Sequence, residues 1–535
     1  MQNQNVAHII FENAKKFPER VALRIPKEWT DEKVTSYETL TFGELSQRIK
    51  AYISGLKKKG LISRDRVILL FPPNVDMYAF ILALMASGII SVLIDTGMGI
   101  KKFLMAISDA KAKVLISMDA FLKYRFFLPQ LWKCEWYSID KCGLKVKPLS
   151  YLLDDTSQEI ALANVSDDHT ALITYTSGST GRPKGADRTH GCLLNQHLAI
   201  REDWPDKLGD IDMTCFPVFV FHNLACGMTT VLPGMNLGTP AKVNPQIIVQ
   251  QIKENNITRL SGAPAFMAKF CKYIIQNKTT LPSLKTLITG GAPVSLTLCK
   301  IMREALPETS INVGYGSTEI EPVSTISIDE ILSSKGEGLL VGKPVSEAKV
   351  EFVNLPKNPD DITDRTLKSY ILPNGEIGEL VATGPHVVKR YIDNPEANRE
   401  NKIPGIAGNV WHRTGDTGYF DKEGRIWLTG RCKDVVNYKG KILQPYPIEL
   451  KIDEIPGIER SALIADKDKN NPLIAIACSL DADKNKVETA VKTWLKEADL
   501  SDIKVKLVTE IPVDGRHNSK IDRPTLRKQF SKDFK

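Results

Sequence analysis

The chain has 535 residues, of which 42% are hydrophobic and 25% are charged, and its formal net charge is +8. This composition is ordinary for a globular protein, and the length exceeds that of one typical folding core, so we expect a two-domain protein. The lysines are scattered among acidic residues, which argues against nucleic-acid binding and leaves open only a weak attraction to anionic membrane surfaces. Nine cysteines without a CxxC pair argue against a disulfide framework or a zinc site and favour a reducing cytosol.

The first segments of the chain have the patterns of a layered α/β domain. Residues 1–20 lack the long apolar core of a secretory signal and indicate an amphipathic helix. A second helix ending at Gly60 is predicted by a stripe of apolar residues at helical spacing, Leu45, Ile49, Tyr52, Ile53 and Leu56. The run RVILLF that follows predicts a strand, and the alternation of helix and strand predicts the α/β class.

Residues 77–94 form an apolar run whose length suggests a membrane span. Ser87 and Gly88 interrupt the run, its second half is rich in β-branched residues, and Asp95 closes it. The pattern therefore favours a buried helix followed by a buried parallel strand, and we expect no transmembrane segment.

Residues 174–191, TYTSGSTGRPKGADRTHG, place hydroxyls, glycines and cations between two apolar segments. A β-rich run precedes the loop and a helical pattern follows it, so we expect the loop at a strand-to-helix junction. Hydroxyls and glycine N–H groups facing an anion, together with basic side chains, suit a polyphosphate, although a solvated turn has the same composition. The candidate phosphate ligands are Thr176, Ser177, Gly178, Ser179, Thr180, Gly181 and Lys184. The loop is not the nucleoside-triphosphatase P-loop, because Pro183 precedes Lys184 and Gly185 follows it.

The segment TSGSTGRPKG resembles the phosphate-binding signature of the adenylate-forming superfamily, which contains acyl-CoA synthetases, luciferases and peptide-synthetase adenylation domains. Further motifs follow in the family's order: GGAP at 290–293, GYGSTE at 314–319, WHRTGDTGYFDKEGRIWLTGRCKD at 411–434, and RHNSKIDR at 516–523. The resemblance implies an N-terminal AMP-binding domain of layered α/β sheets at 1–432. It also implies a small, mobile α+β lid at 433–535 that rotates about Lys433.

The resemblance implies roles for the residues around GYGSTE. Glu319 would hold Mg²⁺, which prefers oxygen ligands, and Thr318 would donate its hydroxyl to the α-phosphate. Tyr315, in a Gly-Tyr-Gly-Ser turn, would stack on adenine, with Gly316 and Ser317 beside the nucleotide. The close wall of the adenine pocket would be formed by Gly291, Ala292 and Pro293, because small residues let a flat base approach the backbone.

The later motifs would complete the nucleotide site. Both carboxylate oxygens of Asp416 can accept hydrogen bonds from the ribose hydroxyls, and Arg431 can reach the ribose or a phosphate. DTGYFDKEGRIWLTGR taken alone predicts a hairpin with a DKEG turn. Lys520 on the lid would be the catalytic cation of adenylation, active only when the lid is closed. The usual Ser-Gly-Lys is here Asn518-Ser519-Lys520, a less flexible loop.

The motifs disagree on the second half-reaction. RHNSKIDR resembles a segment of the β-lactone synthetases of bacterial olefin biosynthesis, whose substrates are 2-alkyl-3-hydroxy fatty acids. GRCKDVVNYKGK at 430–441 is closer to acyl-CoA ligases, in which the Gly440 loop lines a pantetheine tunnel. His222 stands where CoA ligases carry a gate beside the acyl tunnel, or else it is a packed core histidine. An apolar pocket around it has five candidate lining residues: Phe216, Phe219, Phe221, Leu224 and Met228.

We therefore expect an enzyme that uses ATP and Mg²⁺ to convert a fatty or hydroxy-fatty acid into its acyl adenylate with release of pyrophosphate. The acyl group then passes to CoA; β-lactone closure and transfer to an acyl carrier protein are the alternatives. His222, Gly291 and Gly316 are the expected acyl-binding residues. A catalytically silent nucleotide-binding relative is disfavoured, because the site residues that such a protein would lose are all present: Glu319, Asp416, Arg431 and Lys520.

Overall fold

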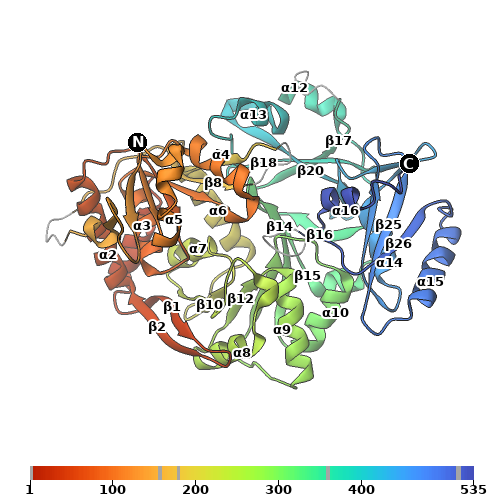
Figure 1. Cartoon of the computed structure of the whole chain (residues 1–535), viewed down its shortest axis with the longest axis horizontal. Helices are drawn as coiled ribbons and strands as arrows, with labels where there is room; N and C mark the ends of the chain where they lie inside the picture. The colour runs from red at the N-terminus through yellow and green to blue at the C-terminus, as the bar shows by residue number, and fades with distance from the viewer. Residues whose placement is uncertain (1–3, 155–159, 177–180, 357–361, 514–519, 535) are drawn as a thin grey trace.

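The computed structural model describes residues 4–154, 160–176, 181–356, 362–513 and 520–534 (Figure 1). In the first part of the described chain, seven strands form one sheet in the order β7-β6-β5-β3-β4-β8-β9, parallel except for β9. Its strands are β3 (Arg66–Leu70), β4 (Ile90–Ile94), β5 (Val114–Ser117), β6 (Glu135–Ser138), β7 (Lys147–Pro148), β8 (Thr170–Thr176) and β9 (Lys184–Thr189). The accompanying helices are α1 (Ala7–Lys16), α2 (Phe42–Lys58), α3 (Val75–Ala86), α4 (Ile100–Ala110), α5 (Asp119–Leu122) and α6 (His190–Asp203).

The predictions for residues 42–94 are confirmed. α2 begins at a capping box, in which the Thr41 side chain accepts from the Glu44 N–H and the Glu44 side chain accepts from the Thr41 N–H. Its predicted apolar stripe is buried, as is every residue of α3 except Asp76. The strand β4 follows α3 directly, as expected for residues 77–94. Among the described residues, no helix is long and apolar enough to cross a membrane.

The larger sheet has 14 strands within the described residues, in the order β17-β18-β20-β21-β16-β15-β14-β13-β12-β10-β11-β1-β2, with β19 paired to β20. The strands are β1 (Val21–Trp29), β2 (Val34–Thr41), β10 (Ile211–Thr214), β11 (Thr229–Val231), β12 (Arg259–Gly262), β13 (Thr286–Gly290), β14 (Ser310–Ser317), β15 (Ile320–Ser327), β16 (Leu339–Pro344), β17 (Lys349–Val353), β18 (Gly378–Thr383), β19 (Lys402–Pro404), β20 (Val410–Phe420) and β21 (Ile426–Arg431). The helices of this part are α7 (Phe219–Cys226), α8 (Pro245–Glu254), α9 (Pro264–Gln276), α10 (Leu296–Ala305), α11 (Ile328–Ser333), α12 (Asp364–Leu367) and α13 (Pro395–Asn401).

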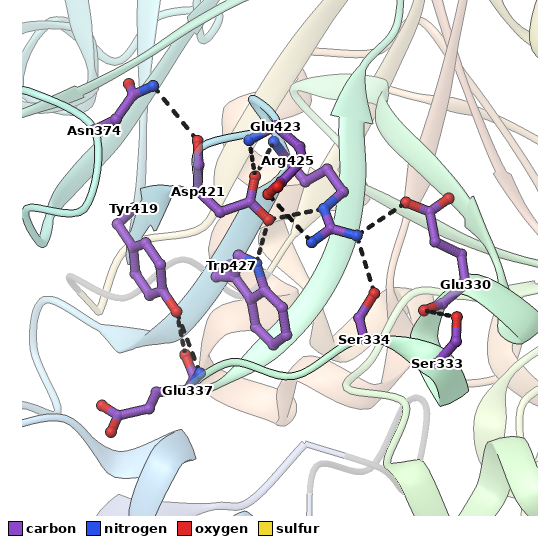
Figure 2. Close-up of polar contacts among 10 residues, drawn as sticks. All are labelled: Glu330, Ser333, Ser334, Glu337, Asn374, Tyr419, Asp421, Glu423, Arg425 and Trp427. Carbon is purple, nitrogen blue, oxygen red and sulfur yellow. Dashed lines mark hydrogen bonds and ion pairs between the residues drawn. The ribbon is translucent and has the colours of Figure 1, made fainter.

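The predicted hairpin with a DKEG turn is formed by β20 and β21, and a polar network fixes its turn (Figure 2). The Asp421 carboxylate accepts from Arg425 Nε at 2.7 Å and from Trp427 Nε1 at 2.9 Å. Arg425 also donates to Ser334 Oγ at 2.9 Å, just beyond α11. The hairpin is thereby anchored to a neighbouring element, and its far end carries two predicted site residues, Asp416 and Arg431.

The C-terminal part of the chain builds a separate, smaller α+β layer. Its elements are β22 (Val436–Tyr438), β23 (Lys441–Leu443), α14 (Pro445–Asp453), β24 (Ile458–Ala465), β25 (Pro472–Cys478), α15 (Lys484–Glu497), β26 (Lys504–Val508) and α16 (Arg523–Gln529). Two apolar clusters within residues 436–534 form its core. Two-domain α/β architecture of this kind agrees with the expected fold class.

Candidate active site

The predicted phosphate loop closes a hairpin, which corrects the expected strand-to-helix junction. Thr176 at the end of β8 pairs with Lys184 at the start of β9, and the two strands run antiparallel. The helix α6 begins only at His190. Its N-cap is Thr189, whose side chain accepts a hydrogen bond from the Cys192 N–H at 3.1 Å. KGADRT becomes a buried strand because it pairs with β8, although its own pattern is polar. Gly181 has a φ of +90°, whereas Ser177, Gly178, Ser179 and Thr180 lie outside the described residues.

Glu319 lies in the two-residue turn between β14 and β15, within a cluster of cations and one tyrosine. The Tyr391 hydroxyl donates to Glu319 Oε1 at 2.7 Å. Two buried lysines flank the Tyr391 ring, with Lys184 Nζ and Lys402 Nζ each 5.3 Å from its centroid. Lys402 also donates to the Val388 carbonyl. This arrangement concentrates positive charge next to a single carboxylate.

The cluster keeps Glu319 ionised. Burial opposes ionisation, but His412, Lys402 and hydrogen bonds from Tyr391 and Ser317 lower the pKa of Glu319 to about 2. The pKa of His412 is itself lowered to about 3, by burial and by Lys402, so its ring is neutral near neutral pH. Burial lowers the pKa of Lys402 to about 8 against the opposing effect of Glu319. Lys402 is therefore the cation that holds the Glu319 carboxylate ionised.

The predicted adenine wall and Tyr315 lie side by side. Because β13 and β14 pair in parallel with Gly290 opposite Gly314, residues 291–293 leave the sheet next to Tyr315. A Cβ on Gly290 would meet the Gly314 carbonyl oxygen at 2.4 Å, and Gly291 has a φ of +80°, so only glycine fits this approach. Tyr315, Gly316 and Ser317 belong to β14 and not to a turn, which corrects the expected local structure.

Asp416 links the two sides of the predicted nucleotide site. Its Oδ2 accepts from the Tyr315 hydroxyl at 2.7 Å, and its Oδ1 accepts from Arg431 Nη1 at 2.7 Å. The register of β20 and β21 places Asp416 directly opposite Arg431. Each carboxylate oxygen has a second lone pair, so both can still accept from a ribose hydroxyl. Asp416 thus directly contacts two other predicted residues, of which Tyr315 comes from a separate motif.

An apolar cavity has its polar end beside Thr318. Arg188 Nη2 donates to the Thr318 carbonyl at 3.0 Å, and Arg188 Nη1 donates to Gln196 Oε1 at 2.9 Å. Arg188 and Gln196 both line a cavity of about 80 Å³. The rest of its wall is mainly apolar, including Ile9, Ile10, Leu82, Met85, Leu193 and Phe219.

His222 is buried and also lines this cavity, which agrees with a packed histidine, and its role as a gate stays a prediction. Its Nδ1 lies 3.1 Å from His197 Nδ1, and its Nε2 lies 3.6 Å from Cys226 Sγ. Burial lowers the pKa of His197 to about 4 and that of His222 well below its usual value, so both rings are neutral. Of the predicted lining residues, Phe219 and Phe221 line the cavity, whereas Phe216, Leu224 and Met228 are not among the described residues that do.

The C-terminal candidates occupy exposed positions. Lys433 lies in the turn after β21, and the next residue, Asp434, is buried against Arg527 at 3.1 Å and Arg523 at 3.5 Å. Lys520 is exposed just before α16, next to residues outside the described chain. Gly440, with a φ of +81°, lies at the exposed tip of the β22–β23 hairpin.

Several residues of the site were not predicted from the sequence. Tyr391 and Lys402 lie in stretches without any motif, so their contribution to the Glu319 cluster had no local signal. Arg188 and His412 do lie inside quoted motifs, in GADRTH and WHRTGD, and their positions there could have singled them out. The pairing of His197 with His222 depends on α6 packing beside α7, which one sequence does not reveal.

Comparisons with known proteins find relatives that match nearly the whole chain. The olefin β-lactone synthetase of Stenotrophomonas maltophilia is 26% identical, over 98% of this chain and 97% of its own length. Feruloyl-CoA synthase from an Amycolatopsis species is 27% identical, over 92% of this chain and 94% of its own length. Both relatives are therefore similar along nearly the whole chain.

Solved structures show the same fold. The amide bond synthetase from Marinactinospora thermotolerans superposes with a TM-score of 0.80 at 20% identity, covering 98% of this chain and 99% of that one. O-succinylbenzoate coenzyme A synthetase from Bacillus subtilis, in complex with ATP and a magnesium ion, has a TM-score of 0.76 at 20% identity, covering 97% of this chain and 99% of that one. Residues 10–392 match the family described as AMP-binding enzyme. This match spans well over half of the sequence, and the protein belongs to the AMP-binding enzyme family of adenylate-forming ligases.

Proposed function

We propose that the protein uses ATP and Mg²⁺ to activate a fatty or hydroxy-fatty acid as its acyl adenylate, releases pyrophosphate, and transfers the acyl group to CoA. The observation that carries this proposal is the apolar cavity whose polar end, at Arg188, contacts Thr318. An acyl chain in this cavity would direct its carboxylate toward the residues that bind the α-phosphate. The chain and the nucleotide would then meet at the turn between β14 and β15.

The cations of the site suit this reaction. A carboxylate attacking the α-phosphorus brings two anions together, so positive charge must compensate them. Lys184 and Lys402 are buried near Glu319, and we assign Lys520 of the lid as the cation that completes the closed site. Mg²⁺ is commonly held by one or two carboxylates together with substrate phosphates, and the ionised Glu319 fits that role. Bound Mg²⁺ would neutralise phosphate charge as pyrophosphate leaves.

The nucleotide would occupy the contacts between the three motifs. Adenine would stack on Tyr315 against Gly291, Ala292 and Pro293, and the ribose hydroxyls would donate to Asp416 beside Arg431. The contacts of Asp416 with Tyr315 and Arg431 support this assignment, because they fix the carboxylate before the nucleotide binds. We also assign the boundary between the domains to Lys433, since Asp434 is already tied to the C-terminal helix α16.

The cavity favours an apolar acid over an amino acid. Its described lining contains no aspartate or glutamate that could pair with a substrate ammonium. Its volume of about 80 Å³ is below the ~300–1,000 Å³ of typical ligand sites, so a long chain must displace side chains along the wall. Phe219 and Leu82 border the cavity and are candidates for this movement.

A second candidate for the final step is closure of a 3-hydroxy acid to a β-lactone, in which the substrate hydroxyl displaces AMP. Two observations favour it. The olefin β-lactone synthetase relatives match over 98% of the chain. The neutral His197–His222 pair also gives the apolar cavity hydrogen-bonding groups that an oxygen on the acyl chain can use. Transfer to an acyl carrier protein is the third possibility.

Mass spectrometry of reaction products distinguishes these steps. The protein is incubated with MgATP, CoA and a mixture of plain fatty acids and 2-alkyl-3-hydroxy acids. An acyl-CoA product supports the CoA ligase, whereas a CoA-independent product lighter than the hydroxy acid by one water supports the β-lactone synthetase. Acyl-AMP that forms without either product leaves a carrier protein as the acceptor. If none of these acids gives an adenylate, the proposed substrate class is wrong.

A further inference from the structure

Large apolar side chains are exposed together between α5 and β6 and in the loop that follows β6. Two short 3₁₀ turns, η2 (Arg125–Phe127) and η3 (Pro129–Leu131), contain or directly flank four of them. The exposed fractions are 63% for Tyr124, 46% for Phe126, 81% for Phe127, 61% for Trp132 and 73% for Leu144. We call these five residues the aromatic patch. Single exposed apolar residues are common, but a group of this size marks a surface that binds something apolar.

The aromatic patch rests on an ordered platform. Arg125 is buried beneath it and donates to the Leu122 carbonyl at 2.6 Å and to the Leu144 carbonyl, which joins the two loops. The Arg125 guanidinium lies 4.2 Å from the centroid of the Phe126 ring, and Phe126 meets Trp136 edge to face at 6.0 Å. The Phe126 ring and the backbone of the two loops are therefore held by contacts beneath this face.

The surroundings of the aromatic patch carry an excess of positive charge. Residues 119–147 contain six basic and three acidic residues, and exposed lysines flank the patch at 133, 141 and 145. Each of the acidic residues is engaged locally: Asp119 with Lys123 at 3.2 Å, Glu135 with Lys147 at 3.1 Å, and Asp140 with the Ser138 hydroxyl at 2.6 Å. An approaching surface thus meets aromatic rings surrounded by lysines whose charge the acidic neighbours only partly offset.

We propose that the aromatic patch docks the protein on an anionic lipid bilayer, with Phe127 and Trp132 entering the interface. Aromatic rings are favoured at the headgroup level, and flanking lysines attract anionic headgroups. An acidic protein surface would satisfy the lysines, but it would not require so many rings pointing outward from two short turns. Docking through residues 119–147 would require neither a particular acyl substrate nor a particular second half-reaction.

Co-sedimentation with vesicles tests the proposal. The full chain is mixed with vesicles of phosphatidylcholine alone or with about one third phosphatidylglycerol. We expect binding to the anionic vesicles, weaker binding to the neutral ones, and a loss of binding at high salt. The variant Phe127→Ser/Trp132→Ser should lower the partition coefficient at least about tenfold, since burial of one aromatic side chain is worth that factor. Lys133→Ala/Lys145→Ala should lower it on anionic vesicles only.

A matched control removes two exposed apolar side chains elsewhere. Leu208 and Ile406 are 88% and 72% exposed on other loops, so Leu208→Ser/Ile406→Ser should bind vesicles like the wild type. Circular dichroism and ATP–pyrophosphate exchange verify that every variant is folded. Equal partitioning of the patch variant and the wild type would overturn the proposal. Failure of the wild type to bind anionic vesicles would overturn it as well and would reassign the aromatic patch to a protein partner.

Discussion

Replacing Lys402 with methionine tests whether this lysine holds Glu319 ionised. Methionine keeps much of the length of the side chain and removes its charge. The lowering of the pKa of Glu319 from 4.5 to about 2 corresponds to about 3 kcal/mol of favourable interactions with the ionised carboxylate. Part of this free energy should be lost in Lys402→Met, because His412, Tyr391 and Ser317 also favour the ionised carboxylate but the removal of Lys402 leaves the buried charge less compensated. The same partner is lost in Glu319→Gln, so the two changes should not be additive.

Thermal unfolding of the wild type, both single variants and the double variant measures the coupling between Lys402 and Glu319. At neutral pH we expect the double variant to be more stable than additivity predicts, by roughly 1–2 kcal/mol or about 2–4 °C. The pKa of Lys402 in the folded protein is about 8, so the lysine loses its charge as the pH rises through that value. The coupling should therefore be present at about pH 7 and largely lost at about pH 9.5.

Lys402 also makes the stability of the wild type depend on pH. The pKa of Lys402 lies below its ordinary value of 10.5, so the unfolded chain binds more protons between about pH 8 and 10.5. The cost of burying the charged lysine is fully present below pH 8 and is relieved as the pH rises through this window. Lys402→Met should lack this rise in stability. Additive effects within about 0.5 kcal/mol, or a coupling that is the same at both pH values, would refute the assignment of Lys402.

Three further changes test the nucleotide site, the cavity and the lid. Asp416→Asn should weaken AMP binding by about 10- to 100-fold in calorimetry, because a charged acceptor is lost; an unchanged affinity excludes the ribose role. Phe219→Ala should shift kcat/KM toward longer acyl chains by about tenfold, whereas lower stability with an unchanged chain-length profile means that Phe219 only fills the core. Lys520→Ala should slow adenylation at least about 100-fold and leave the affinity for ATP unchanged; normal turnover would remove Lys520 from the chemistry.

Local sequence patterns were sufficient to predict the helices and strands whose own residues form an apolar, buried stretch. The helix α3 and the strand β4 followed from an apolar run broken at Ser87 and Gly88, since both the helix and the strand are decided by neighbours in the chain. The strand β9 was missed because KGADRT has no strand pattern of its own and is buried by pairing with β8. GYGS indicated a turn because of its glycines, yet the segment forms a strand that packs closely against Gly290.

The site residues likewise fall into two groups: those that sequence motifs indicated, and those that only the fold brings together. Tyr315, Asp416 and Arg431 were assigned from motifs. Strand register places Asp416 opposite Arg431, and the Tyr315 hydroxyl reaches Asp416 from β14, which does not pair with β20. Lys402 could not be assigned from the sequence. Its position near Glu319 depends on the pairing of β19 with β20, and both strands lie far from Glu319 in the chain. The apolar cavity also joins residues of α1, α3, α6 and α7, and no single segment of the sequence encodes such a wall.

The central claim is that the apolar cavity, whose lining residue Arg188 contacts the Thr318 carbonyl, selects an acid with an apolar chain for adenylation. ATP–pyrophosphate exchange, measured with fatty acids, hydroxy-fatty acids, aromatic acids and amino acids, tests it most directly. We predict exchange that depends on fatty or hydroxy-fatty acids, with kcat/KM at least about 100-fold above that for amino acids, because the cavity offers no partner for an ammonium group. Equal exchange with amino acids, or exchange confined to aromatic acids, would contradict the account.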